Sequence, residues 1–315
     1  MARCRLGVRG RGVRAGAWVW GLLGALGCVD PASTQGTGGA PSGGGGSGGD
    51  SAGAAPGGSG GLGGLGGAGA AGATGPGSGG AELGPGWDCV GSVEWPPLDN
   101  PDMLAQFRFF DESDTSSYLV GATVRACSRD DLDCVAPESE GVTDREGRVT
   151  LPLVVAPDSE GWTGYLEVTA VEGSGYPVNL ITTVRPFTDS PNSSYGIVSE
   201  ALLNGAGALI SGSLPDPTRG HLAVRVFDCS SESAAGAAVV VSPAEGASIG
   251  YLGEDVIPDP DLEATGPIGL AAAVNVEPGF ADVSLTLGPG GPLIGQTTVP
   301  VRAGAITTFG LGPTP

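Results

Sequence analysis

Cysteine is the residue type in this chain whose number and spacing most clearly suggest chemistry. Six cysteines occur among 315 residues, and five of them lie beyond residue 27. No pair has the C-x-x-C spacing and histidine occurs once, so neither a zinc site nor a histidine-based catalytic set is indicated. Disulfide formation and modification of a single thiol are the chemistries that remain. The five cysteines beyond residue 27 are Cys28, Cys89, Cys127, Cys134 and Cys229.

The first segment of the chain has the layout of an export signal. Five arginines precede the apolar run AGAWVWGLLGAL at 15–26, which is shorter than the roughly 20 apolar residues of a membrane-spanning helix. Ala25-Leu26-Gly27-Cys28 follows and resembles the lipobox of bacterial lipoproteins, in which the cysteine is acylated and becomes the first residue. We therefore expect a signal peptide at 1–27 and a lipidated Cys28 that anchors the chain to the cell envelope, at the outer membrane. Plain secretion after cleavage by the general signal peptidase is the alternative.

Acylation of Cys28 would leave four cysteines, an even number that can pair in an oxidising compartment. Cys127 and Cys134 enclose SRDDLD, a polar segment that can turn and bring the two Cα atoms within the roughly 4.4–6.8 Å that a disulfide requires. The second pair is then Cys89 with Cys229, which would close a loop of about 140 residues and tie distant parts of the chain together. The alternative leaves Cys89 and Cys229 as free thiols.

Carboxylates are abundant, but their arrangement does not indicate a catalytic centre. The formal net charge is −20 at pH 7, which disfavours a nucleic acid partner. The runs DESD (111–114) and DDLD (130–133) are typical of solvated turns, with calcium binding as an alternative that no EF-hand spacing supports. His221 opens an expected strand without evident partners. We expect no catalytic residue, no metal site and no cofactor.

A glycine-rich tract separates the anchor from the rest of the chain. Residues 31–86 contain no apolar periodicity that could offset the entropy of ordering the backbone. We expect 28–86 to be a disordered linker with a root-mean-square span of about 40 Å. Matches to nucleophile and nucleotide-binding patterns within this tract neither follow a strand nor open a helix, so they are chance matches.

From Trp87 onward the composition changes to short apolar or alternating segments between turn residues, the pattern of β-strands. Two similar modules are expected, at 87–190 and 218–315. The segment 191–217 between them is a connector in which Ser199 could cap a short helix, although Gly205 and Gly207 weaken that prediction.

Four landmarks recur in the same order in both modules and indicate an internal repeat. RFFD (108–111) followed by GATV (121–124) corresponds to RVFD (225–228) followed by GAAV (236–239). Thr143 and Gly147 have the same spacing as Thr265 and Gly269, and each module closes near a Val-Arg pair, Val184-Arg185 and Val301-Arg302. We therefore predict a module of about 90–100 residues that occurs twice, a normal domain size.

The order of strands and turns resembles the carboxypeptidase regulatory-like family, most clearly in GVTDREGRVTLPLVV (141–155) and GWTGYLEVTAV (161–171). Asp144 is expected to cap the turn and Gly147 to take a positive φ. The second module departs from the pattern because TGPIGL replaces the aspartate. The resemblance implies an all-β fold of two tandem transthyretin-like or Ig-like β-sandwiches, and it implies an accessory role without catalytic residues.

The whole layout also resembles that of Gram-negative envelope lipoproteins, and these features predict a non-catalytic cell-envelope lipoprotein. Its membrane contact would be the lipid anchor, and its two modules would serve structural, adhesive or scaffolding contact with an envelope protein or a glycan. A carbohydrate- or calcium-binding module is the alternative. A hydrolase is a third possibility, for which the sequence shows no coherent set of acid, base and nucleophile.

Overall fold

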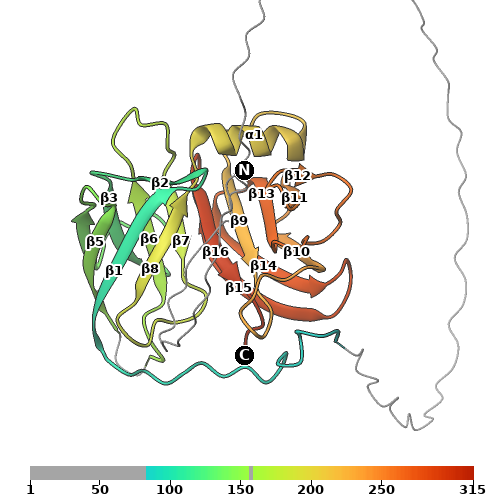
Figure 1. Cartoon of the computed structure of the whole chain (residues 1–315), viewed down its shortest axis with the longest axis horizontal. Coiled ribbons are helices and arrows are strands. Elements are labelled where there is room, and N and C mark those ends of the chain that lie inside the picture. The colour runs from blue at the N-terminus through green and yellow to red at the C-terminus, as the bar shows by residue number, and fades with distance from the viewer. Residues whose placement is uncertain (1–82, 156–158) are drawn as a thin grey trace, which may run out of the picture. The chain divides into compact units, whose positions relative to one another are not determined.

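The computed structural model describes residues 83–155 and 159–315 (Figure 1). This part consists of β-strands and a single α-helix, and it confirms the all-β class with two tandem β-sandwiches. Within the described ranges, no helix is both long and apolar enough to span a bilayer. The expected signal peptide, Cys28 and nearly all of the expected linker lie outside the described residues.

The first module forms a sandwich of two sheets. In one sheet β1 pairs antiparallel with β5 and parallel with β8, and β2 pairs with the end of β1. The burial of β1 alternates, so that Met103, Ala105 and Phe107 face the core while Leu104 and Gln106 face outward. The strands are β1 (Asp102–Asp111), β2 (Asp114–Tyr118), β3 (Thr123–Ser128), β4 (Ser139–Val142), β5 (Arg148–Val154), β6 (Gly164–Thr169), β7 (Asn179–Thr182) and β8 (Asn192–Ile197).

The second module repeats this topology. Strand β9 pairs antiparallel with β13 and parallel with β16, as β1 does with β5 and β8. The order β10-β14-β15 likewise repeats the order β3-β6-β7. The strands are β9 (Gly220–Val226), β10 (Ala237–Ser242), β11 (Ser248–Leu252), β12 (Pro258–Asp259), β13 (Leu270–Val276), β14 (Gly279–Leu287), β15 (Leu293–Val301) and β16 (Ile306–Leu311).

The repeated threonines have the same hydrogen bonds in both modules. The Thr143 hydroxyl accepts from the Ala122 amide at 2.9 Å and donates to the Leu119 carbonyl at 2.5 Å. The Thr265 hydroxyl accepts from the amide of Ala237 at 3.0 Å and donates to the carbonyl of Ala234 at 2.7 Å. Both threonines are buried, so each needs this pair of backbone partners, which explains why threonine recurs at this point of the repeat.

The repeated glycines are required by close backbone approach. Gly147 has φ +70°, and a Cβ there would lie 2.3 Å from the Phe109 carbonyl oxygen. Gly269 has φ +65°, and its Cβ would lie 2.6 Å from the Val226 carbonyl oxygen. Asp144 accepts from the backbone of Arg148 as predicted for the turn before β5. The internal repeat predicted from the sequence is therefore present down to individual backbone contacts.

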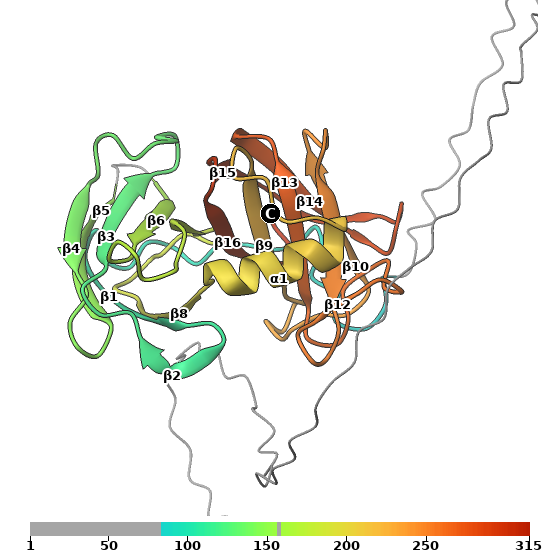
Figure 2. The same cartoon turned by 90° about the horizontal axis from the view of Figure 1, so that it is seen from above.

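The two sandwiches share one continuous sheet, which the sequence did not indicate. β7 of the first module pairs in parallel with β16 of the second, giving the nine-stranded order β12-β11-β13-β9-β16-β7-β6-β3-β4. Figure 2 shows β6 of the first module and β16 of the second on the two sides of this junction. Two residues that are directly opposite each other on paired strands point to the same face of the sheet. Ile181, opposite Thr308, belongs to the first core, whereas Phe309, opposite Thr182, belongs to the second. The two cores therefore lie on opposite faces of the shared sheet.

The segment expected to be a connector contributes to both parts of the fold. Its first residues form β8, which completes the first sandwich, and helix α1 (Glu200–Ser211) follows. Ser199 is the N-cap and accepts from the Leu202 amide, while Gly212 ends the helix with φ 73°. Leu203 of the helix packs with Ile306 of β16, so α1 lies on the same face of the shared sheet as the first core.

Candidate functional site

The four cysteines of the described chain form two disulfides, as the sequence predicted. Cys127 and Cys134 are bonded with a Cα–Cα separation of 5.3 Å. Cys89 and Cys229 are bonded across 140 residues with a Cα–Cα separation of 5.7 Å. The alternative of free thiols at Cys89 and Cys229 is therefore wrong.

The disulfide of Cys127 and Cys134 shapes an acidic loop, which we call the 127–134 loop. The phenol of Tyr165 in β6 donates to the Asp131 carbonyl at 2.5 Å and to the Leu132 carbonyl at 3.1 Å. Burial raises the pKa of Tyr165 to about 12, so this phenol keeps its proton and remains a donor at neutral pH. Both cysteines are fully buried beside Tyr165. The Tyr165 side chain therefore attaches the loop to the shared sheet.

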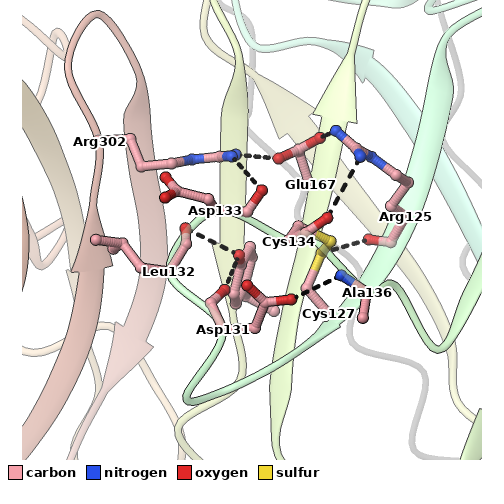
Figure 3. Close-up of polar contacts among 10 residues, drawn as sticks. Arg125, Cys127, Asp131, Leu132, Asp133, Cys134, Ala136, Glu167 and Arg302 are labelled. Carbon is pink, nitrogen blue, oxygen red and sulfur yellow. Dashed lines mark hydrogen bonds and ion pairs between the residues drawn. A yellow bond between two sulfur atoms is a disulfide. The ribbon is translucent and has the colours of Figure 1, made fainter.

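A buried carboxylate lies next to this loop and joins the two modules. Glu167 of β6 is only 2 % exposed. One of its carboxylate oxygens pairs with Arg125 of β3 and the other with Arg302, which follows β15 (Figure 3). Because Arg125 and Arg302 belong to different modules, the single negative charge of Glu167 holds two cations from opposite sides of the junction.

The arginines around Glu167 also bind the backbone of the 127–134 loop. Arg125 donates to the Cys134 carbonyl and Arg302 to the Asp133 carbonyl, each at 3.4 Å (Figure 3). Arg129 within the loop donates to the Thr297 hydroxyl at 3.1 Å, on strand β15 of the second module. We name the set of Arg125, Glu167, Arg302 and the 127–134 loop the junction cluster.

The disulfide of Cys89 and Cys229 attaches the segment that precedes β1 to the second module. Trp87 is 4 % exposed and packs into the second core, with Leu83 and Val90 against it. The Cys229 amide donates to the Gly86 carbonyl at 2.9 Å. The segment that opens the first predicted module is therefore fastened to the second module before the chain enters β1.

The remaining candidate groups of the sequence form separate local structures. His221 is 2 % exposed, and its Nδ1 accepts from the Asn275 amide at 3.3 Å. Burial lowers the pKa of His221, which favours the neutral ring. Asp111 and Asp114 accept hydrogen bonds from the nearby Ser113 and Ser116. Glu112 between them is half-buried, and burial raises its pKa, so this run is only partly the solvated turn that the sequence predicted.

Calcium binding by the acidic runs is the alternative that the sequence leaves open. In residues 83–155 and 159–315, no group of three or more histidine, cysteine or carboxylate side chains is placed to hold a metal ion. The cysteine thiols are bonded to each other, and the carboxylate of Glu167 is paired with two guanidinium groups. The ion pairs of the junction cluster connect β3 of the first module with the residue that follows β15 of the second.

Sequence reasoning missed Glu167 and Arg302 as members of a site. The strand GYLEVTAV shows a single charge among apolar residues, and alternation places it on the face opposite Leu166 and Val168. That face looks solvent-exposed for an isolated sandwich. A charge flanked by the aromatic Tyr165 on the same face was the available signal that something covers it.

Comparisons with known proteins return only solved structures of low similarity. No protein-family model and no curated protein matches the chain. Among solved structures, the shaft pilin SpaA from Lactobacillus rhamnosus GG is similar over 68 % of this chain and 98 % of its own, at 10 % identity and a TM-score of 0.22. GBS52, the minor pilin of Streptococcus agalactiae, is similar over 67 % and 97 %, at 15 % identity and a TM-score of 0.20.

A third structural neighbour is the Bacillus anthracis TIE protein, at 13 % identity and a TM-score of 0.21. The match covers 69 % of this chain and 35 % of that one, so the chain spans about a third of that neighbour's length. The strands and sheets of the structure themselves define the class, an all-β protein of tandem β-sandwiches. The particular structures to which it is similar are two pilins and the TIE protein.

Proposed function

We propose that this chain is a non-catalytic, lipid-anchored protein of the bacterial cell envelope that presents its two fused sandwiches for structural, adhesive or scaffolding contact. The observation that supports this most is the junction of the modules. A continuous sheet crosses it, and the buried Glu167 pairs with arginines on both sides. Two modules with a fixed relative orientation present their surfaces to a partner in one arrangement, which suits structural, adhesive or scaffolding contact.

The proposed anchor is Cys28, followed by a flexible linker at 28–86. A linker of this composition has a root-mean-square span of about 40 Å, which would let the head reach partners beyond the membrane surface. The partner would be an envelope protein or a glycan, and the location the outer membrane.

We also infer that the modules are of the carboxypeptidase regulatory-like kind. The support is the turn before β5, where Asp144 accepts from the Arg148 amide at 2.9 Å and Gly147 has a positive φ. The same backbone course is kept in the second module, where Gly266 replaces the aspartate and Gly269 keeps the positive φ.

The proposed anchor is tested on the native protein. Mass spectrometry of the mature N-terminus should find an acylated Cys28, and the variant Cys28→Ser should lose partitioning into detergent. Cys4→Ser, which changes a cysteine of the expected signal peptide, is the matched control and should leave partitioning unchanged. An unmodified N-terminus at Cys28 or beyond it would overturn the lipoprotein proposal.

A further inference from the structure

The internal repeat shows that one strand edge is occupied in the second module and open in the first. Strand β8 is the equivalent of β16, because each pairs in parallel with the first strand of its module. The outer edge of β16 is occupied by β7, again in parallel. In the described part of the chain, β8 pairs with β1 and with no other strand.

Among the described residues, no strand bonds to the backbone groups of β8 that face away from β1. The Gln106 amide donates to the Pro191 carbonyl at 2.8 Å and the Glu112 amide to the Ile197 carbonyl at 3.0 Å. In a parallel ladder, alternate residues of β8 face β1 and the others face away. The amides and carbonyls of Asn192 and Ser194 therefore point away from β1. Neither a charge nor a proline lies within β8 to discourage pairing.

The other long edges of the described sandwiches are protected. Strand β5 has Pro152 at a position that faces away from β1, and proline removes a donor from the edge. On β15 the Gln296 amide donates to the Thr314 hydroxyl at 3.3 Å. On β10 the Val239 amide donates to the Tyr251 hydroxyl at 3.0 Å. The edge of β8 thus differs from the edges of β5, β10 and β15, because it carries no such protection among the described residues.

A cavity of about 150 Å³ touches β8 at Tyr195. Its lining is mostly apolar and comes from both modules: Ile181 and Phe187 near β7, Tyr195 of β8, and Thr308 with Gly310 of β16. A space of this size holds one benzene-sized group, which corresponds to one apolar side chain. A strand added to β8 would extend the sheet over this flank of the first core, where alternate side chains point inward.

We propose that the outer edge of β8 accepts a parallel β-strand from another protein, with one apolar side chain of that strand filling the cavity. The partner segment is extended and uncharged, as β7 (Asn179–Thr182) is where it pairs with β16. A second copy of this chain does not offer the equivalent strand. That strand is β15, whose outer edge is closed by Thr314 and by Arg129, which donates to the Thr298 carbonyl at 3.2 Å.

This inference deepens the proposed function, since it assigns the contact surface of the head to one strand edge. The probe is a capped peptide with the sequence of residues 177–184, Pro-Val-Asn-Leu-Ile-Thr-Thr-Val, which is uncharged. The protein is the exported chain carrying Cys28→Ser, so that the result does not depend on lipidation. Calorimetric titration to about 1 mM peptide covers the weak end of specific binding, and hydrogen exchange of the Asn192 and Ser194 amides identifies the edge that is used.

Binding is expected, together with slower exchange at Asn192 and Ser194. Ser194→Pro removes an outward amide and should weaken binding at least tenfold. Thr150→Pro places the same change on the outward side of β5, and it should leave binding unchanged within twofold.

Peptide variants test the strand geometry while the protein stays native. Two variant peptides carry aspartate in place of the leucine that corresponds to Leu180 or of the isoleucine that corresponds to Ile181. Adjacent side chains of a strand point to opposite faces. We therefore expect one of these two peptides to lose binding and the other to keep it. No binding, equal loss in both peptides, or no protection at Asn192 and Ser194 would overturn the proposal. Dimerisation of the chain that Ser194→Pro abolishes would assign the edge to a second copy and would also overturn it. None of these results affects the lipidation test.

Discussion

Removing the charge of Glu167 should strongly destabilise the fold, because it is the only carboxylate that the structure places between Arg125 and Arg302 within the described residues. In Glu167→Gln the two guanidinium groups would face each other without a counter-charge. Removing one partner of a fully buried ion pair costs about 3–5 kcal/mol. The side chains of Arg125 and Arg302 are 31 % and 17 % exposed, so water can partly rehydrate them, and we expect a loss of about 2–4 kcal/mol in the free energy of unfolding.

The measurement is chemical denaturation followed by far-ultraviolet circular dichroism. The matched control is Glu146→Gln, which also removes a glutamate lying beside two arginines, Arg145 and Arg148. Those side chains are 91 % and 56 % exposed, and exposed ion pairs contribute at most about 1 kcal/mol. If Glu167→Gln costs no more than Glu146→Gln, the buried cluster does not hold the modules and our argument is refuted.

Three further perturbations test other parts of the fold. Replacing Cys89 and Cys229 by serine should lower the free energy of unfolding by about 5 kcal/mol in the chain-entropy model, since their loop spans 140 residues; an unchanged denaturation midpoint would contradict this. Gly147→Ala should cost about 1–3 kcal/mol because its Cβ would meet the Phe109 carbonyl, whereas Gly173→Ala, with φ +77° and open space, should cost less. Burial raises the pKa of Glu112 to about 6 from 4.5, so the folded state binds its proton more tightly. That stabilisation, up to about 2 kcal/mol, is complete below pH 4.5 and lost as pH rises through 6, and a pH series on Glu112→Gln should lack this decline.

Local features of the described chain followed from the sequence because they depend on neighbouring residues. The turn of Asp144 and Gly147, the cap of α1 at Ser199 and the disulfide of Cys127 with Cys134 each involve residues a few positions apart. Turn geometry, capping and short loop closure are set by such near neighbours. The repeat also followed, because the same local requirements recur in the same order in both modules.

Only the tertiary structure decided how the modules join. The strand β7 has no sequence feature that selects β16 as its partner, because backbone ladder bonds are available to any strand of suitable geometry. Glu167 on an alternating strand looks like an outward-facing charge until Arg302 and the 127–134 loop cover it. Which edge is closed and which stays open depends on contacts between residues more than 100 positions apart, and local sequence preferences do not encode such contacts. The sequence by itself determined the building block and its repetition, and the packing of distant surfaces determined the fused sheet, the buried charge and the open edge of β8.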